Sequence, residues 1–276
     1  MIFDRIGIIT NEKKDPLFEN TENLINYLSG KKNIKIYADK DYPDDDLYKM
    51  CNLFIVLGGD GTILKAAAKA SLYNIPLIGI NLGRIGFMSE IENDELELLD
   101  NLFTGDYEIK NRMMLNVEII KSGGDILHAG AALNDAVVTH GTLAKLIETE
   151  VLCDNIRITK YRADGIIAAT PTGSTAYSMS AGGPIIDPNI ECICLTPICP
   201  HSLASRPLIF SSGSVLEIKN KSVNSDVYLT VDGQINIKLD EEDTVRVRKS
   251  GFASKLISIK KHGFYDVVRA KISDNY

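Results

Sequence analysis

The chain has 276 residues, enough for one large domain or two modest ones with a sizeable core. Its formal charge of −7 excludes a general attraction for nucleic acid or anionic membranes, so a polyanion would have to be bound locally. No apolar run approaches the roughly 20 residues needed to cross a bilayer, and the acidic start does not fit a signal peptide. The 5 scattered cysteines suggest a reducing compartment. We therefore expect a soluble protein of the cytoplasm.

The first hundred residues alternate between strand and helix patterns. Short apolar runs predict strands, and apolar residues at helical spacing predict the helices between them. The acidic run 39–46 is expected to be a solvated loop or helix start. This alternation predicts a Rossmann-like α/β domain with a parallel sheet and right-handed crossovers. The expected strands are 6–10, 33–37, 53–57 and 75–80, and the expected helices are 16–28, 63–70 and 94–104.

From about residue 107 the pattern changes to short strands separated by turn signals. One helix is expected among them, at 175–182. The pattern predicts a β-rich second domain of the β-sandwich type. We expect an α/β domain at 1–105, a β-rich domain at 106–255, and a C-terminal segment, 256–276, that packs back on the first domain. The expected strands are 116–120, 136–139, 147–151, 166–169, 191–196, 215–218, 227–231 and 244–247.

The motif Gly58-Gly59-Asp60-Gly61-Thr62 is the most informative part of the chain. It joins a predicted buried strand to a predicted helix, at the sheet edge where open α/β folds bind ligands. Glycines allow the backbone to approach a phosphate, and a helix N-terminus favours the anion. A carboxylate repels phosphate, so Asp60 suggests a metal ligand or a base that accepts a proton from a hydroxyl. The motif indicates phosphoryl transfer, with a helix N-cap as the structural alternative for Asp60.

Two polar pairs precede predicted strands and offer groups to a ligand. Asn134 and Asp135 would hold the adjacent hydroxyls of a ribose. Arg162 and Asp164 would bind a substrate that has both donors and acceptors. Each pair is more often found in a simple turn, so neither alone assigns a site.

Small hydroxyl residues gather around Gly173 in the segment 170–184. One interpretation is a binding site, since these residues offer many N–H and O–H donors to one ligand. The structural alternative is that they form a Ser/Thr-rich helix cap. Neither Ser174 nor Ser178 fits a hydrolase nucleophile, because the glycines of a nucleophile elbow are absent.

Three cysteines and a histidine form the last cluster: Cys192, Cys194, Cys199 and His201. Their spacing fits no common zinc site. We expect buried structural thiols, with His201 and Arg206 left open as ligand contacts.

Together these segments resemble the bacterial NAD kinases, which phosphorylate the 2′-hydroxyl of the adenosine ribose of NAD to make NADP. The opening motif alone is shared with diacylglycerol and sphingosine kinases and, more loosely, with phosphofructokinases. The later blocks, taken in the order in which they occur along the chain, look specific to NAD kinases. These blocks are 81–87, 133–135, 164–165, 170–184, 195–203 and 232–234.

The resemblance implies a role for each matching position. Asp60 would take the proton of the 2′-hydroxyl as this group attacks the γ-phosphorus of ATP, with Gly61 close to the substrate. Asn134 and Asp135 would hold NAD. The family usually carries Glu after this Asn, so the side chain of Asp135 is one methylene shorter. The remaining implied residues are Gly58, Gly59 and Thr62 of the phosphate loop, and Lys145, Arg162, Asp164, Thr175, Ala176, Tyr177, Ser178, Met179, Ser180 and Gln234 around the substrate.

The resemblance also implies cofactors and partners. Mg²⁺ or another divalent cation would bridge the donor phosphates, with no metal assigned to protein side chains. ATP would be the donor, with polyphosphate as the alternative, and NAD the acceptor. No nucleic acid or membrane is expected, and the chain is expected to form a homodimer or homotetramer through its β-rich domain. The sequence leaves open the choice of donor, activity on NADH, feedback regulation, the oligomeric state and any ligand contacts across subunits.

Three other functions compete with this interpretation. A lipid kinase of the diacylglycerol type would share the loop, but Asn134-Asp135 and the block 172–177 argue against it. A non-catalytic dinucleotide-binding or redox-sensing protein is disfavoured by the intact Asp60. A dehydrogenase would need Gly-x-Gly-x-x-Gly after the first strand, where this chain has Asn11-Glu12-Lys13.

Overall fold

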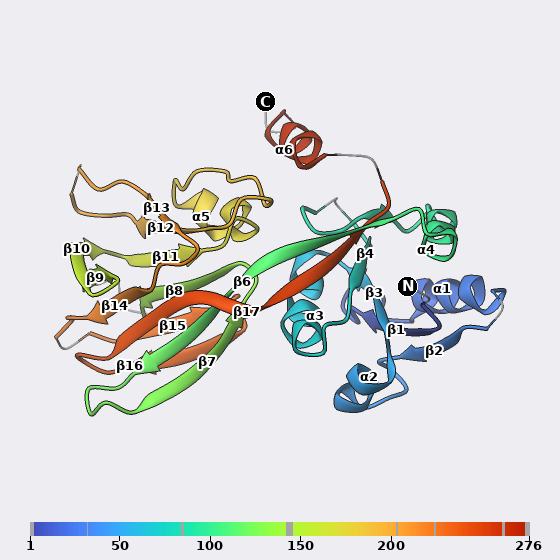
Figure 1. Cartoon of the computed structure of the whole chain (residues 1–276), viewed down its shortest axis with the longest axis horizontal. Helices are drawn as coiled ribbons and strands as arrows, with labels where there is room; N and C mark the ends of the chain where they lie inside the picture. The colour runs from blue at the N-terminus through green and yellow to red at the C-terminus, as the bar shows by residue number, and fades with distance from the viewer. Residues whose placement is uncertain are drawn as a thin grey trace. The chain divides into compact units, whose positions relative to one another are not determined.

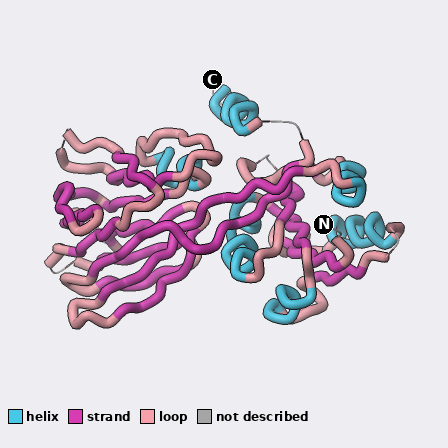
Figure 2. Tube along the Cα trace, viewed as in Figure 1, coloured by secondary structure: helices cyan, strands magenta, loops and turns pink. Residues whose placement is uncertain are grey.

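The computed structural model of the chain describes residues 3–31, 33–83, 86–141, 146–202, 204–223, 225–260 and 263–273. The chain divides into two compact units, Met1–Asn111 with Phe252–Tyr276, and Arg112–Gly251. Helices gather in the first unit, whereas strands make up most of the second (Figures 1 and 2). Strands β6 (Glu108–Ile120) and β17 (Thr244–Ser258) each contribute residues to both units. The predicted fold class is confirmed: an α/β domain is joined to a β-rich domain.

The first unit is built on a parallel sheet. Every position of its central strands β3 and β4 is buried, which explains their unbroken apolar sequences. All four strands predicted in this part of the sequence are confirmed. The strand order is β17–β4–β3–β1–β2, with β5 paired to β4. The bounds are β1 (Arg5–Thr10), β2 (Lys35–Ala38), β3 (Leu53–Gly58), β4 (Leu77–Asn81) and β5 (Ile91–Glu92).

The helices of the first unit follow the apolar spacing of the sequence, with two corrections. Helix α1 starts three residues later than predicted, because the Asp15 carboxylate accepts hydrogen bonds from the backbone N–H groups of Asn20 and Thr21 and so holds the preceding turn. The single helix predicted at 94–104 is instead a 3-10 turn followed by one α-helical turn, ended by Gly105 at φ 87. The bounds are α1 (Glu19–Ser29), α2 (Asp44–Met50), α3 (Asp60–Leu72), η1 (Leu96–Asp100), α4 (Asn101–Thr104) and α6 (Phe264–Ser273).

The second unit contains two sheets. One has the order β10–β9–β14–β17–β6–β7, and the other the order β13–β12–β11–β8–β15–β16. The remaining bounds are β7 (Ile126–Ala132), β8 (Asp135–His140), β9 (Ile147–Cys153), β10 (Ile156–Ala163), β11 (Gly165–Ala169), β12 (Cys192–Ile198), β13 (Leu208–Ser211), β14 (Leu216–Asn220), β15 (Val227–Val231) and β16 (Ile235–Leu239).

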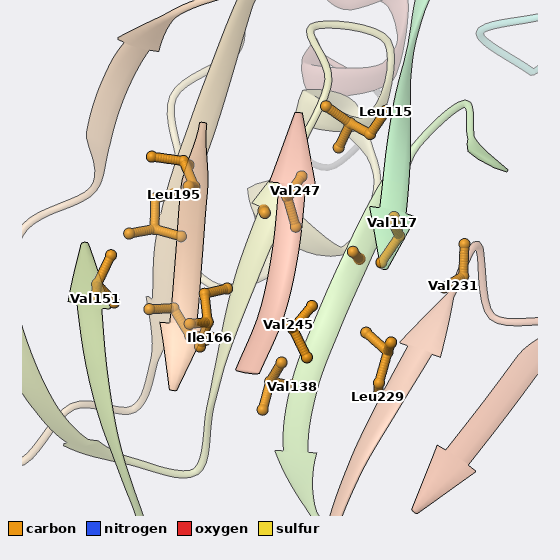
Figure 3. Packing of buried hydrophobic residues seen from close by; sticks show 14 of the residues in the cluster. Leu115, Val117, Val138, Val151, Ile166, Leu195, Leu229, Val231, Val245 and Val247 are labelled. Carbon is orange, nitrogen blue, oxygen red and sulfur yellow. The ribbon is translucent and has the colours of Figure 1, made fainter. Parts of the chain in front are cut away.

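Aliphatic side chains from both sheets pack into one core in the second unit (Figure 3). Val117 and Val245 come from the first sheet, and Val138 and Ile166 from the second. Each such side chain contributes about 1.5–3 kcal/mol when it is removed from water. Buried and partly buried positions alternate along β14 and β15, as is typical of a β-sandwich, whereas β11 and β12 are buried at every position.

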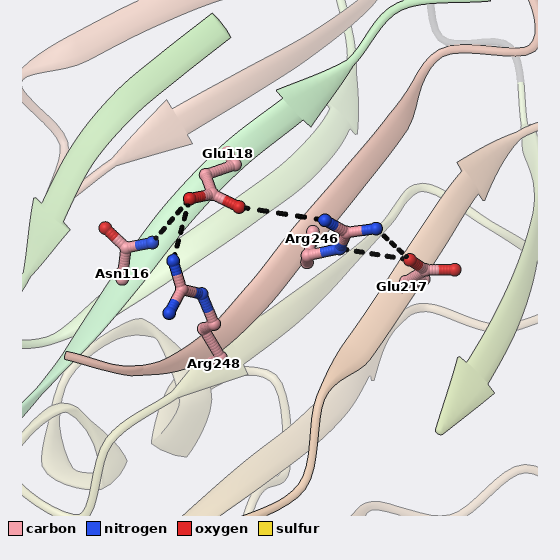
Figure 4. A network of polar contacts seen from close by, with 5 residues as sticks. All are labelled: Asn116, Glu118, Glu217, Arg246 and Arg248. Atoms are coloured by element: carbon pink, nitrogen blue, oxygen red, sulfur yellow. Dashed lines mark hydrogen bonds and ion pairs between the residues drawn. The ribbon is translucent and has the colours of Figure 1, made fainter. Parts of the chain in front are cut away.

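A charged network crosses the strands β6, β17 and β14 (Figure 4). Glu118 accepts hydrogen bonds from Asn116 and Arg248, and Arg246 donates to Glu217. Burial alone would raise the pKa of Glu118, but the hydrogen bonds from Arg248 and Asn116 bring it below its usual value. The network therefore ties neighbouring strands together while Glu118 is ionised.

In the part of the chain that the structure describes, no helix is long and apolar enough to cross a membrane.

Candidate functional site

The glycine motif forms the turn between β3 and α3. Gly58 ends the strand, Gly59 is the N-cap, and Asp60 is the first residue of the helix. A Cβ atom on Gly58 would lie 2.4 Å from the Thr62 hydroxyl oxygen, so this position has no room for a side chain. The same hydroxyl accepts a hydrogen bond of 2.9 Å from the side chain of Asn11. The turn is therefore packed against the end of β1.

The carboxylate of Asp60 is held by the loop that follows β4. It accepts hydrogen bonds from the backbone N–H groups of Phe87 at 2.8 Å and Met88 at 3.0 Å. The N-cap position is taken by Gly59, so Asp60 is the first residue of the helix and not its N-cap. A Cβ atom on Gly86 would lie 1.9 Å from the carboxylate. A glycine is required at 86 because the carboxylate occupies that space.

A cavity of about 900 Å³ in the first unit opens beside this loop and includes Asp60 in its lining. The Lys14 ammonium lies 3.1 Å from the position that a Cβ on Gly59 would take, and 3.5 Å from the equivalent position on Gly83. Lysines outnumber carboxylates in its wall, so the cavity is locally cationic in an acidic chain. Its lysines are Lys13, Lys14, Lys65, Lys69 and Lys271, and its carboxylates are Glu12, Asp39 and Asp60.

The sequence interpretation missed Asn11, Lys14, Lys65 and Lys271. A signal for the first two was present, since they directly follow β1, which pairs with β3 in the parallel sheet. Carboxyl ends of neighbouring parallel strands meet at one edge, so residues after β1 lie near the glycine turn. Lys271 lies about two hundred residues further on, and no local pattern connects it to the cavity.

In the second unit the Asn134-Asp135 turn is held by Asp232, a residue that was not singled out for the site. The Asp232 carboxylate accepts hydrogen bonds from the backbone N–H groups of Leu133 and Asn134 at 2.8 Å and Asp135 at 3.0 Å. Asp232 and Gly233 both have positive φ angles, which confirms the turn predicted from the Asp-Gly pair. The two turns are thus joined through one carboxylate.

This turn holds a buried carboxylate and a buried side-chain oxygen that has no hydrogen-bond partner among the described residues. Asp135 is only 5% exposed, and burial together with the Asp232 charge raises its pKa to about 7. The side-chain oxygen of Asn134 is buried and has no hydrogen-bond partner among the described residues. Buried polar groups cost free energy unless they are paired, so this turn suits a ligand that brings hydroxyl groups.

The Ser/Thr-rich block packs directly on this turn. The Thr170 hydroxyl donates to the Leu133 carbonyl, and a Cβ on Gly173 would lie 2.1 Å from the Asn134 carbonyl oxygen. The helix predicted at 175–182 is shorter in the structure, consisting of the 3-10 turn η2 (Gly173–Thr175) and the helix α5 (Tyr177–Ser180).

Members of this block differ in what they offer a ligand. Ser178 is fully buried and its hydroxyl is hydrogen-bonded to that of Thr196, and Thr175 donates to the Thr172 carbonyl. Tyr177 is 44% exposed. Burial, and then the charges of Cys199, Asp164 and Asp135, raise the pKa of Tyr177. The tyrosine is therefore the block's exposed aromatic group near the buried turn, with the exposed Met179 and Ser180 on the same helix.

The other predicted positions are more peripheral. Arg162 is exposed and forms an ion pair of 3.3 Å with Glu148. The Asp164 carboxylate lies 3.9 Å from His140, and its backbone carbonyl accepts a hydrogen bond from the Thr139 hydroxyl. Gln234 directly follows the turn at 232–233, and Ala176 is the N-cap residue of α5. Lys145 lies outside the described residues.

The cysteine cluster does not form a metal site in the described part of the chain, where no group of three or more His, Cys, Asp or Glu side chains could hold an ion. Cys192 and Cys194 are buried as predicted. The prediction is wrong for Cys199, which is exposed because it follows the end of β12.

Both halves of the chain match known families. Residues 44–107 match the ATP-NAD kinase N-terminal domain, and residues 133–259 match the ATP-NAD kinase C-terminal domain. The chain is 39% identical to the NAD kinase of Natranaerobius thermophilus, over 97% of each chain. It is 42% identical to the NAD kinase of Geobacter sulfurreducens, over 83% of this chain and 80% of that protein.

Two solved structures have the same fold. The yeast NADH kinase complexed with NADH superposes with a TM-score of 0.87 and 26% identity, covering 97% of this chain and 86% of the other. An NAD kinase from Archaeoglobus fulgidus in complex with ATP gives a TM-score of 0.78 at 24% identity, covering 98% of both chains.

Proposed function

The chain belongs to the bacterial NAD kinase family and is an enzyme of that family, and we propose that it transfers the γ-phosphoryl group of ATP to the 2′-hydroxyl of the adenosine ribose of NAD. The products are NADP and ADP. The observation that carries the proposal is the Asp60 carboxylate, which two backbone N–H groups hold at the wall of a cationic cavity.

The first unit binds the donor. The cavity beside the glycine turn has room for a nucleotide, and its lysines attract a triphosphate. The start of α3, with Gly59 and Gly61 exposing backbone, adds the positive end of a helix dipole. The Archaeoglobus relative was solved with ATP, which supports ATP as the donor here. Polyphosphate has the same anionic groups and is the alternative donor.

A divalent cation arrives with the donor rather than as a resident ion. The described residues offer no cluster of acidic or thiol ligands, and both oxygens of Asp60 already accept backbone hydrogen bonds. The side chains that the structure describes therefore do not fit a resident metal site. We assign the cation, Mg²⁺ or a similar ion, to the ATP substrate complex.

Asp60 acts as the general base of the transfer. The 2′-oxygen forms a bond to the γ-phosphorus while the bond from that phosphorus to the β,γ-bridging oxygen breaks, and ADP leaves. The proton of the 2′-hydroxyl passes to the Asp60 carboxylate. Phosphoryl transfer depends mainly on positioning and on stabilising charge, so a base fixed by two backbone donors meets the first requirement.

The second unit binds NAD. The unpaired Asn134 oxygen and the buried Asp135 carboxylate accept hydrogen bonds from hydroxyl groups of the dinucleotide, and Tyr177 supplies an aromatic surface. The yeast relative was solved with NADH, which supports a dinucleotide ligand. We expect Ser178 and Thr175 to support the turn, since their hydroxyls are already bonded within the protein. The remaining proposed contacts are Gly61, Lys145, Arg162, Asp164, Ala176, Met179, Ser180 and Gln234.

We further propose that the enzyme works as a homodimer or homotetramer in the cytoplasm. Size-exclusion chromatography with light scattering measures the oligomeric state directly.

The test of the function is a substrate panel on the purified full-length chain. Mg²⁺ with ATP or polyphosphate is combined with NAD, NADH or diacylglycerol, and the products are separated by chromatography. We expect NADP from NAD and ATP. Phosphorylated diacylglycerol without NADP would contradict the proposed function.

A further inference from the structure

The C-terminal helix α6 contacts the loop that holds Asp60. The rings of Phe264 and Phe87 have centroids 6.3 Å apart at an angle of 42°. The Lys271 ammonium lies 4.5 Å from the centroid of the Phe87 ring. Aromatic pairs and cation–π pairs of this geometry are both attractive. Two residues of α6, seven positions apart, therefore hold the same ring.

Phe87 connects these contacts to the carboxylate of Asp60. Its ring is the part that α6 contacts, and its backbone N–H donates to Asp60 Oδ2 at 2.8 Å. The next residue, Met88, donates to Oδ1 at 3.0 Å. A ring held in place fixes its own backbone, because few rotamers are compatible with both partners. The position of α6 thus bears on the orientation of the proposed base.

Lys271 has a second neighbour, the proposed donor cavity. It lies in the cavity wall together with Lys13, Lys14 and Lys65. An ammonium group has three N–H donors, and an aromatic ring covers it from one side. A lysine that lines a cavity beside other lysines favours an anion there, and an ATP triphosphate is the anion that the proposed function supplies.

We propose that α6 completes the donor site: Lys271 binds the triphosphate of ATP, while Phe264 and Lys271 hold Phe87 so that its N–H orients Asp60. This proposal rests on the proposed function for the identity of the donor. Lys271 is then a binding residue, and Phe87 and Phe264 are positioning residues. The two roles predict different kinetic effects.

Loss of the lysine charge is expected to weaken donor binding. In Lys271→Met the stem stays and the ammonium is lost, so the Kd for ATP should rise about tenfold, as expected for one charge-assisted hydrogen bond. Lys271→Arg retains the charge and should restore much of the affinity. The matched control is Arg269→Met on the same helix, because Arg269 pairs with Asp266 and is absent from the cavity wall.

Loss of the ring is expected to affect turnover instead. Phe87→Leu keeps the backbone N–H but loses both aromatic contacts, so kcat should fall about tenfold or more with little change in the Kd for ATP. Phe264→Leu should act in the same direction. If these rings had a purely structural role, the variants would melt at lower temperature. Their kcat per folded molecule would then equal that of the parent.

The deciding experiment measures ATP binding by titration calorimetry and NADP formation by steady-state kinetics on the same full-length preparations. Circular dichroism melts establish that each variant is folded. Weaker ATP binding in Lys271→Met, with Arg269→Met like the parent, supports the inference. Equal ATP affinity in both variants would overturn it. If the parent binds ATP but makes no NADP, the proposed function fails, and the binding comparison still decides the role of Lys271.

Discussion

Two aspartates of the candidate site are held by backbone N–H groups, and each fixes a different part of that site. Asp60 accepts two such hydrogen bonds and thereby aims its own carboxylate. Asp232 accepts three and thereby shapes the neighbouring turn. The sequence interpretation identified Asp60 from its motif. It could not identify Asp232 as the holder of Asn134, because that contact joins residues almost a hundred positions apart.

Gly86 offers a direct test of how closely the Asp60 carboxylate must be held. A methyl group at this position would lie 1.9 Å from it, so Gly86→Ala must move either the carboxylate or the loop. A displacement of about 1 Å at a reacting group costs about 100-fold in rate, so we expect a kcat loss of that order. The measurement is steady-state NADP formation, with melting curves to verify folding.

The control for this variant is Gly251→Ala, because a Cβ there meets no atom within 4 Å. It should behave like the parent. A folded Gly86→Ala enzyme with the parent's kcat would disprove the positioning argument.

The raised pKa of Asp135 leads us to predict that the free energy of unfolding depends on pH. The folded pKa of about 7 lies above the usual value of an aspartate, because burial favours the neutral acid. Between pH 4 and 7 the folded chain retains a proton that the unfolded chain has released, so stability falls as pH rises, by about 1.4 kcal/mol per pH unit, and levels off above 7. Asp135→Asn has no carboxyl to ionise and so avoids this decrease in stability. The variant should therefore be more stable than the parent at pH 8.

Urea unfolding at pH 5 and pH 8 measures this effect. The difference between Asp135→Asn and the parent should be larger at pH 8. The exposed Asp125→Asn is the matched control and should show no such trend. An asparagine variant less stable than the parent at pH 8 would contradict the assignment. NAD affinity should fall in Asp135→Asn, because a negatively charged acceptor is lost.

At the scale of elements, the central strands were predicted from the sequence, whereas most edge strands, apart from β2, were not. The five strands missed are β5, β7, β10, β13 and β16. The two-residue strand β5 pairs only with β4, and the other four lie at the edges of their sheets. Their positions alternate poorly between buried and exposed, as in the pattern eeieB of β16. The central strands are buried on one or both faces and so carry a clear apolar pattern. The lengths of β6 and β17 were also underestimated, because each continues from one unit into the other.

The hydrogen bonds between the Asp232 carboxylate and the turn at 133–135 join two turns, and a substitution can break them. In Asp232→Asn one carboxylate oxygen becomes an NH₂ group, which faces a backbone N–H of the turn at 133–135 instead of accepting from it. Leaving a buried donor unpaired costs about 1–3 kcal/mol. We expect lower stability and weaker NAD binding, with ATP binding unchanged.

Calorimetry with each nucleotide separates these effects. The control is Asp240→Asn, at an exposed carboxylate of the same unit. Equal loss of ATP and NAD binding in Asp232→Asn would mean that the turn has no specific role in holding NAD.

At the scale of the whole molecule, the chain is acidic while its proposed donor cavity is cationic. A net charge of −7 coexists with five lysines around one cavity, so the charge is organised locally and not as a general field. The first unit takes residues from both ends of the sequence, and this is what brings Lys271 to a cavity built by residues 9–86. Motifs located the phosphate loop and the Asn134-Asp135 turn. The segment 256–276 was expected to pack on the first domain, but only the folded chain brings Lys271 of α6 to the cavity wall.

The central claim is that Asp60 removes the proton of the acceptor hydroxyl. The most direct measurement compares Asp60→Asn with the parent in NADP formation and in NAD and ATP binding, with Asp125→Asn as the matched carboxylate-to-amide control. General-base catalysis is worth about 10²–10⁴-fold, so we predict a kcat loss in that range with both nucleotides still bound. A folded Asp60→Asn enzyme that makes NADP as fast as the parent would contradict the account.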